Sequence, residues 1–255
     1  NTISNNGINN PVLEFAYQGP KLKYIGENIS INVTGDVNFK IIRKNKNLEF
    51  SCYENIVLEN NDCLDILSTN RSVYGYLSIG GTFEVDYYLN SCSTNTKAKI
   101  GANSGEKLEK GQIIQLKNIK KILPKNKIEY LNSKIENIRI IKGPHFDYFS
   151  KDAIDLFFSN EFNVTKLSDR MGIRLKGPKI SNIKNTNIKS EGLVKGVIQI
   201  TADGDPIIML SDHGTIGGYP KIGVVISADY DKLAQIPPGS KIKFKEINLK
   251  DAETI

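Results

Sequence analysis

The sequence is poor in the residues that build metal sites and disulfide frameworks. It contains two histidines, His145 and His213, and three cysteines, Cys52, Cys63 and Cys92, which show no CxxC spacing. An odd, sparse set of cysteines indicates reduced thiols rather than paired ones. Because neither residue type is clustered, we expect no dedicated zinc site.

Long apolar runs and two common catalytic motifs are also missing. No apolar run approaches the ~20 residues that a membrane-spanning helix needs, and no basic-then-apolar signal segment opens the chain. We therefore expect a cytoplasmic protein with no membrane partner. The chain has no GxxxxGKS or GxxxxGKT loop, which excludes P-loop ATP binding, and no GxSxG, which disfavours an α/β-hydrolase.

The charge of the chain is basic but comes mostly from lysine. Lysine and arginine together number 34 against 28 acidic residues, a net charge of +6, and only five residues are arginine. The basic stretch Lys117–Lys127 has no aromatic residues between its lysines and is typical of a solvated linker. Nucleic-acid binding requires a clustered basic face or a known module, so we expect no nucleic-acid partner.

Short alternating segments predict a mainly β protein with a few short helices. The clearest helix is Lys151–Phe162, which has Ser150 as N-cap and apolar residues at helical spacing. A shorter helix is expected from Asp229 to just before Pro237. The predicted strands, beside those described next, are Asn28–Thr34, Val73–Ile79, Ile113–Leu116 and Ile138–Ile141.

The connection Ser211–Lys221 joins two apolar runs, Ile207–Leu210 and Ile222–Ile226, and contains three glycines and a proline. Such a loop can present backbone N–H groups and polar side chains to a small anionic or carbonyl ligand. A tight hairpin that needs its glycines explains the pattern equally well. Ser211, Asp212 and His213 include all three triad residue types, but consecutive residues cannot form a hydrogen-bonded relay among themselves.

Four motifs carry a resemblance to a known family over nearly the whole chain. They are Gly217–Ile222, Ser168–Pro178, Gly192–Ile200 and, more weakly, Gly143–Asp147. Taken together, they resemble the allophanate-hydrolase-subunit-2-like, or biotin-dependent carboxyltransferase, family. The resemblance implies tandem cyclophilin-like β-barrels, and we place the two units at residues 1–134 and 135–255.

An internal echo agrees with tandem units, because Phe15–Leu22 resembles Ile173–Ile180. Compared with the family, the chain lacks an N-terminal Gly/Pro-rich segment, so we expect the first barrel to be incomplete at its N-terminus. Gly214 and Ile216 stand where the family commonly has an amide and a hydroxyl, and Cys92 stands where it often has arginine.

Two arginines four residues apart are the first candidates for a site. Arg170 and Arg174 share a face in either a helix or a strand, and paired guanidinium groups suit a carboxylate, phosphate or carboxyphosphate. Surface salt bridges explain the pair nearly as well.

The remaining candidates surround the glycine-rich connection. Lys221 could neutralise an oxyanion or a carboxylate, with Asp212 as proton acceptor or as the group that orients it. Gln199 lies in an apolar run, so its amide is either buried and hydrogen-bonded or faces the site. The predicted catalytic residues are Arg170, Lys221 and Asp212, and the predicted substrate-binding residues are Arg174, Gln199, Gly217, Gly218 and Tyr219.

The resemblance implies three functions. The leading one is a subunit of an ATP-dependent 5-oxoprolinase complex that opens a lactam, together with a homologous subunit-B-type protein and a third hydrolase-like subunit. The second is half of a biotin-dependent, urea-type carboxyltransferase, with biotin carried on another polypeptide. The third is a non-catalytic regulator that binds a kinase inhibitor. Whether the chain is itself an enzyme stays open at this point.

Overall fold

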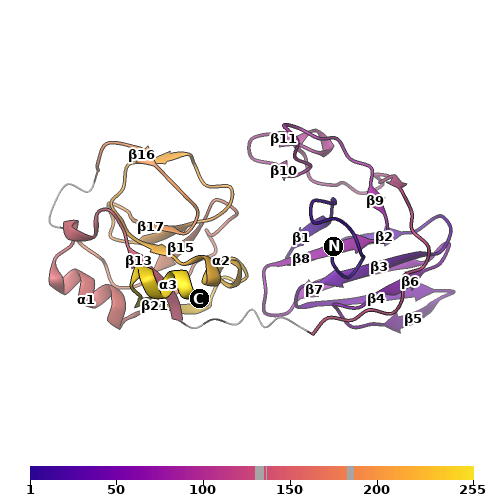
Figure 1. Ribbon diagram of the computed structural model, residues 1–255, viewed down its shortest axis with the longest axis horizontal. Coiled ribbons are helices and arrows are strands. Elements are labelled where there is room, and N and C mark those ends of the chain that lie inside the picture. The colour runs from indigo at the N-terminus through magenta and orange to yellow at the C-terminus, as the bar shows by residue number, and fades with distance from the viewer. Residues whose placement is uncertain (130–134, 136, 183–186) are drawn as a thin grey trace. The chain divides into compact units, whose positions relative to one another are not determined.

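The chain folds into two mainly β units, as the sequence predicts for the class. A computed structural model describes residues 1–129, 135, 137–182 and 187–255. The two compact units are Asn1–Asn132 and Ser133–Ile255 (Figure 1), each with its own hydrophobic core.

The first unit is built from two four-stranded antiparallel sheets. One sheet has the order β1–β8–β3–β6, with bounds Leu13–Ala16, Tyr74–Ile79, Ile29–Thr34 and Ile56–Leu58. The other has the order β2–β7–β4–β5, with bounds Lys21–Lys23, Cys63–Thr69, Val37–Arg43 and Lys46–Glu49. Smaller elements are β9 (Thr82–Phe83) paired with β12 (Leu116–Lys117), β10 (Thr94–Asn95) paired with β11 (Ile100–Gly101), and the 3-10 turn Asn103–Gly105. Apolar residues of both large sheets form one core.

Two expectations for this unit need correction. The strand predicted at Ile113–Leu116 is confined to Leu116–Lys117, since Ile113 is exposed and only the last residue of the predicted range pairs with β9. The stretch Lys117–Lys127 is not a free linker. The Lys120 ammonium donates to the Asn6 side chain at 2.7 Å, and the Leu123 N–H donates to Ser30 Oγ at 2.9 Å, so this segment packs along the first unit.

The second unit is a closed seven-stranded barrel with the order β13–β20–β17–β18–β15–β14–β21. The bounds in that order are Asn137–Lys142, Lys221–Val225, Val197–Ile200, Pro206–Met209, Gly172–Lys176, Glu161–Val164 and Lys241–Glu246. All pairs are antiparallel except β13 with β21, which is parallel and closes the barrel. A short ribbon lies outside it, made of β16 (Glu191–Gly192) and β19 (Ile216–Gly217).

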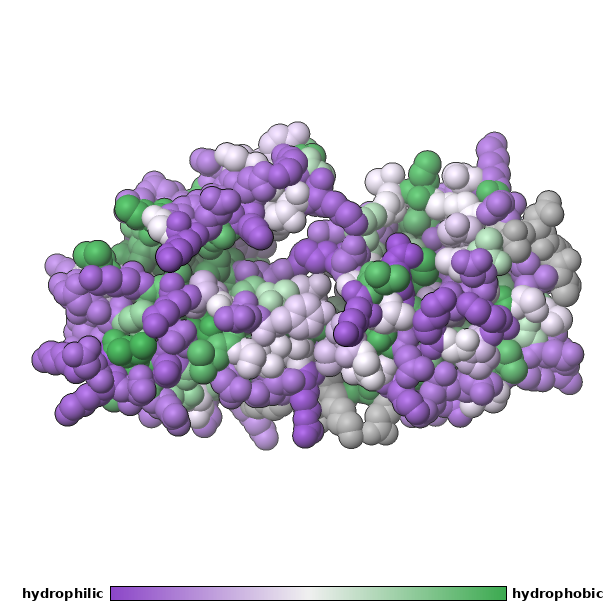
Figure 2. All heavy atoms as spheres, turned by 180° about the vertical axis from the view of Figure 1, so that it is seen from behind, coloured by the Kyte–Doolittle hydropathy of each residue, from purple (hydrophilic) through white to green (hydrophobic). Residues whose placement is uncertain are grey.

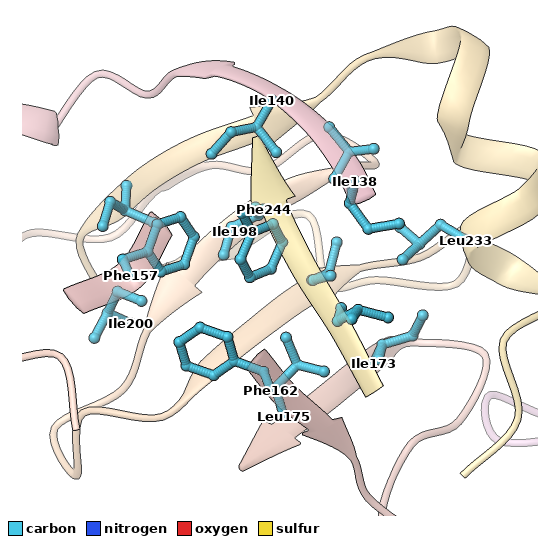
Figure 3. Packing of buried hydrophobic residues seen from close by; sticks show 14 of the residues in the cluster. Ile138, Ile140, Phe157, Phe162, Ile173, Leu175, Ile198, Ile200, Leu233 and Phe244 are labelled. Carbon is cyan, nitrogen blue, oxygen red and sulfur yellow. The ribbon is translucent and has the colours of Figure 1, made fainter. Parts of the chain in front are cut away.

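Alternating residues of the barrel strands point inward and meet aromatic rings near β21 (Figure 3). Ile173, Leu175, Ile198 and Ile200 belong to this core, together with Phe244 of β21. Because the inward residues of each strand are fixed in this way, the residues between them must face outward.

Helix α1 (Lys151–Ser159) begins as predicted, with the Ser150 side chain accepting a hydrogen bond from the Ala153 N–H. It packs Phe157 flat against Phe244, with ring centroids 4.4 Å apart. The predicted end at Phe162 is wrong, because Asn160 adopts an extended backbone and Phe162 lies in β14 opposite Ile242.

The other helices are α2 (Ser227–Ala234), α3 (Leu249–Thr254) and the 3-10 turn Phe146–Tyr148. Helix α2 matches its prediction within two residues at its start, and its buried Tyr230 and Leu233 join the barrel core. The apolar runs that flank Ser211–Lys221 are strands β18 and β20, as predicted, but they do not form a hairpin. Both pair with β17, which lies between them.

Hydrophilic side chains cover much of the face shown in Figure 2. Within the described part of the chain, no helix is long and apolar enough to span a membrane.

Candidate functional site

Strand register aligns four residues in one row on the outer face of the barrel. Gln199 of β17 pairs with Lys221 of β20 on one side and with Ile207 of β18 on the other, and Ile207 pairs with Arg174 of β15. Residues directly opposite each other in antiparallel strands project to the same face. The neighbours of these residues point into the core, so the row Lys221–Gln199–Ile207–Arg174 faces outward.

An irregularity in the β17–β20 pairing sets this alignment. Ile198 pairs with Gly223, but the next residue, Gln199, pairs with Lys221, so β20 contributes one extra residue, Ile222. Such bulges re-aim side chains. Here the bulge keeps Ile222 in the core while Lys221 lies opposite Gln199 on the outer face.

The glycine-rich connection folds over Gln199. The Gln199 side-chain Nε2 donates to the Tyr219 carbonyl at 3.2 Å, which satisfies one donor of this buried amide. A Cβ on Gly217 would lie 2.7 Å from the same Nε2 and 2.9 Å from Leu193 Cδ1. A side chain at position 217 would displace the Gln199 amide or the end of Leu193, so glycine lets β19 lie close to Gln199 without moving them.

Lys221 is a buried ammonium group with a carboxylate partner. Its side chain is 4% exposed, and its Nζ lies 3.0 Å from Oε2 of Glu191 on β16, whose side chain is 49% exposed. The hydrogen bond and charge of Lys221 lower the pKa of Glu191. A buried cation without a counter-charge costs several kcal/mol, so this pair explains how lysine is tolerated here.

His145 is hydrogen-bonded to the backbone of Lys221 and lies near the same carboxylate. Its backbone N–H donates to the Lys221 carbonyl at 3.2 Å, and the Lys221 N–H donates to His145 Nδ1 at 3.3 Å. An imidazole nitrogen that accepts a hydrogen bond carries no proton, so the ring proton lies on Nε2. This Nε2 lies 3.6 Å from Oε2 of Glu191. Lys221, Glu191 and His145 form one cluster, which we call the lysine centre.

Gly143 allows His145 to come close enough to form these hydrogen bonds with Lys221. A Cβ on Gly143 would lie 2.4 Å from the Lys221 carbonyl oxygen and 2.8 Å from the Gly223 backbone nitrogen. The segment that leads to His145 can therefore run against β20 only with glycine at this position.

Arg170 and Asp212 form a second, separate pair. Arg170 Nε donates to Asp212 Oδ2 at 3.0 Å, and the Asp212 N–H donates to the Arg170 carbonyl at 3.0 Å. The Arg170 side chain is 43% exposed and that of Asp212 is 20% exposed. The expectation that Asp212 orients Lys221 is therefore corrected, because its carboxylate serves Arg170 and the carboxylate at Lys221 is Glu191.

The two candidate arginines lie in different local structures. Asp169 and Gly172 exchange backbone hydrogen bonds in a tight turn that contains Arg170, whereas Arg174 lies within β15. Arg170 and Arg174 therefore do not share a face, contrary to the expectation from their even spacing, and of the two Arg174 lies in the row with Lys221. Among the substrate-binding candidates, Gln199, Gly217 and Tyr219 lie together, and the Gly218 carbonyl accepts from the Ile188 N–H.

Ser211, Asp212 and His213 face three different partners, as expected of consecutive residues. Ser211 Oγ lies 3.1 Å from the Tyr230 hydroxyl, and His213 Nδ1 lies 2.6 Å from the Gly214 carbonyl oxygen. Within the described residues, no group of three His, Cys, Asp or Glu side chains could hold a metal ion.

The sequence motifs did not single out His145 and Glu191 as site residues. His145 lies in the weak motif Gly143–Asp147, which was a usable signal. Glu191 directly precedes the motif Gly192–Ile200, but its partner is 30 residues further along the chain. The Lys221 ammonium, with Gln199 opposite it in the barrel wall, can meet a small anionic or carbonyl group once Glu191 has moved away.

Comparisons with known proteins agree with the family indicated by the motifs. The chain is 32% identical over 199 residues to a 5-oxoprolinase subunit of Escherichia coli, an alignment that covers 73% of this chain and 61% of that protein. It is 30% identical over 252 residues to the 5-oxoprolinase subunit of the same name from Haemophilus influenzae, covering 99% of this chain and 80% of that protein.

A solved structure matches both units. The crystal structure of Kluyveromyces lactis urea carboxylase superposes with a TM-score of 0.83 at 26% identity, over 96% of this chain and 23% of that one. The family described as carboxyltransferase domain, subdomain A and B, matches residues 1–246. The chain belongs to this carboxyltransferase-domain family.

Proposed function

We propose that this chain is a subunit of a 5-oxoprolinase that hydrolyses 5-oxoproline to glutamate, with ATP used by the complex rather than by a P-loop here. Two relatives that are named as 5-oxoprolinase subunits support the proposal, one of them over 99% of this chain. The observation that carries it is the lysine centre with Gln199 beside it, because 5-oxoproline is a small molecule with a carboxylate and a lactam amide.

The role proposed for this site is to hold the substrate while its lactam is opened. Opening a lactam breaks a C–N bond after the carbonyl has been activated, and the substrate must be held while this happens. Lys221 supplies a fixed positive charge, and Gln199 supplies an amide beside it. Arg174 places a second cation in the same row on the barrel wall. We assign the ATP-dependent step to two partner proteins, one of the subunit-B type and one hydrolase-like.

The proposal is tested by reconstitution. The purified chain is mixed with its subunit-B-type and hydrolase-like partners, and glutamate formed from 5-oxoproline is measured with and without ATP. We expect turnover only when all three proteins and ATP are present. A stable three-protein complex that forms no glutamate contradicts the proposal.

A second function has its own support. The superposition on Kluyveromyces lactis urea carboxylase favours half of a biotin-dependent carboxyltransferase, with biotin carried on another polypeptide. The test adds carboxylated biotin carrier protein and urea to the same preparation and follows loss of the carboxyl group from biotin. Carboxyl transfer without 5-oxoproline hydrolysis would replace the first proposal by the second.

A further inference from the structure

The ion pair at the lysine centre is asymmetric. The Lys221 ammonium is almost fully buried in the barrel wall, whereas its partner Glu191 is half-exposed. Among the described residues, Glu191 is the one carboxylate within ion-pair distance of Lys221. The Lys221 ammonium is held inside the barrel wall, whereas the Glu191 carboxylate can turn into solvent when another anion takes its place, because an unpaired buried ammonium costs several kcal/mol.

The element that carries Glu191 is a short ribbon outside the barrel. Among the described residues, β16 pairs with the two residues of β19, and backbone hydrogen bonds from Ile188 to Gly218 and from Leu193 to Thr215 extend this pairing. A two-stranded ribbon of this size has little stability of its own. Gly192 follows Glu191, and nothing lies within 4 Å of the position that its Cβ would take. The barrel strand β20, which carries Lys221, is by contrast paired on both sides.

His145 lies beside the place where a carboxylate meets the lysine. Its Nε2 is 3.6 Å from the Glu191 oxygen that accepts a hydrogen bond from Lys221 Nζ. The His145 N–H donates to the Lys221 carbonyl and the Lys221 N–H donates to His145 Nδ1, and neither of these hydrogen bonds involves Glu191. A carboxylate from another molecule would therefore meet the Lys221 ammonium with the same imidazole beside it.

We propose that Glu191 occupies on Lys221 the place of a substrate carboxylate, and that substrate binding exchanges one carboxylate for the other. The inference rests on the proposed function for the identity of the substrate, a lactam that carries a carboxylate. The charge around the buried ammonium stays balanced throughout the exchange, so the site selects carboxylates over neutral amides. Because Glu191 competes, the measured affinity is the intrinsic affinity reduced by the fraction of molecules in which Glu191 has left.

The substitution Glu191→Gln separates this role from a structural one. Glutamine keeps an oxygen that can accept from Lys221 but removes the competing charge. Isothermal titration of the full chain is carried out with 5-oxoproline and with 2-pyrrolidinone, the same ring without the carboxylate. We expect 5-oxoproline to bind about tenfold more tightly to the variant, by loss of the competing state. Binding of 2-pyrrolidinone should not change.

A matched control is Glu161→Gln. Glu161 pairs with Lys241 at 3.1 Å, but both of these side chains are more than half exposed on the strands β14 and β21. This variant should leave both affinities unchanged. Where 5-oxoproline binds the wild-type chain, unchanged or weaker binding to Glu191→Gln overturns the inference, because a glutamate that merely supports Lys221 would give that result.

Acetate and lactate are titrated as further probes to separate this inference from the proposed function. Tighter binding of these carboxylates to Glu191→Gln, without binding of 5-oxoproline, supports the exchange and contradicts the oxoprolinase proposal. ATP-dependent 5-oxoproline turnover by the complex, with the same KM for the variant and the wild type, supports the proposal and overturns the exchange. Absence of carboxylate binding to either protein also overturns the exchange.

Discussion

The ion pairs of individual arginines and lysines in this chain differ in which partner is buried, the cation or the carboxylate. Arg43 and Arg139 each hold an aspartate that is almost fully buried, Asp62 and Asp229, through side-chain hydrogen bonds. Lys221 reverses this arrangement, since the cation is buried and the carboxylate is half-exposed. The first arrangement fixes the fold, and the second leaves a cation that a ligand can reach when its partner moves.

Arg170 belongs to neither class, because it and Asp212 form a partly exposed pair. Such pairs contribute about 0.2–1 kcal/mol to stability. If Arg170 contacts substrate, as the sequence motif predicts, Arg170→Ala should lower kcat/KM about 100-fold in the reconstituted assay. The free energy of unfolding should fall by less than about 1 kcal/mol.

Arg71→Ala, at an exposed turn of the first unit, is the control for loss of a surface guanidinium. Urea unfolding and initial rates are measured on both variants. Full activity in Arg170→Ala would show that this pair is only a surface ion pair.

At the scale of elements, the strands with clean alternation were predictable and the short ribbon was not. Asn28–Thr34 and Ile138–Ile141 correspond to β3 and β13 within one residue at each end. The predicted helix Lys151–Phe162 is too long at its C-terminal end. Phe162 is a buried apolar residue, which suits the core face of a helix as well as that of a strand, so helical spacing could not reveal that the chain enters β14 there.

The site was only partly predictable for a similar reason. Lys221, Gln199 and Gly217 were visible as polar or glycine positions beside apolar runs. Their contact depends on the register of β17 against β20, which contains a bulge that no local pattern reveals. The pairing of Glu191 with Lys221 depends on how the ribbon folds back over the barrel, which is a tertiary effect.

Gly143 links the element that carries His145 to strand β20. In Gly143→Ala the new methyl group meets the Lys221 carbonyl, a backbone atom that cannot turn away. We expect a loss of about 1–3 kcal/mol in unfolding free energy, as for other overpacked sites. Ligand binding at Lys221 should also weaken, because His145 is displaced.

Gly192→Ala is the matched control, since its Cβ would meet nothing within 4 Å. Thermal unfolding and 5-oxoproline titration are compared for the two variants. Equal stability of both would contradict the tight contact assigned to Gly143.

At the scale of the whole molecule, the chain consists of two units with separate hydrophobic cores, and a single family model matches residues from both. Each unit contains an arginine that pairs with an almost fully buried aspartate, Arg43 with Asp62 in the first and Arg139 with Asp229 in the second, and we call each pair a clamp. Damage to one clamp should therefore appear first in its own unit.

Asp229→Asn tests this separation and its pH dependence. Burial alone would raise the pKa of Asp229, but the hydrogen bonds from the Arg139 side chain and backbone outweigh it and lower the pKa. A lowered pKa means that the stabilisation is full above the ordinary pKa and is lost as pH falls through the folded value. We expect a loss of about 3 kcal/mol at pH 7 that shrinks in acid below the usual range of aspartate.

Hydrogen exchange followed by mass spectrometry measures this effect for each unit. Peptides from the second barrel should lose protection in Asp229→Asn while those from the first unit keep it. Asp231→Asn, at an exposed position of the same helix α2, should leave the protection of peptides from both units unchanged. Equal loss in both units would contradict separate cores.

The most direct test of the account is ATP-dependent 5-oxoproline hydrolysis by the three-protein complex that contains Lys221→Met. Methionine has nearly the length of the buried lysine side chain but carries no charge, so the fold should persist. We predict normal assembly and unfolding, with glutamate formation reduced at least 100-fold, whereas Lys241→Met, at an exposed ion pair, should be fully active. Wild-type turnover by Lys221→Met would contradict the assignment of the lysine centre as the functional site.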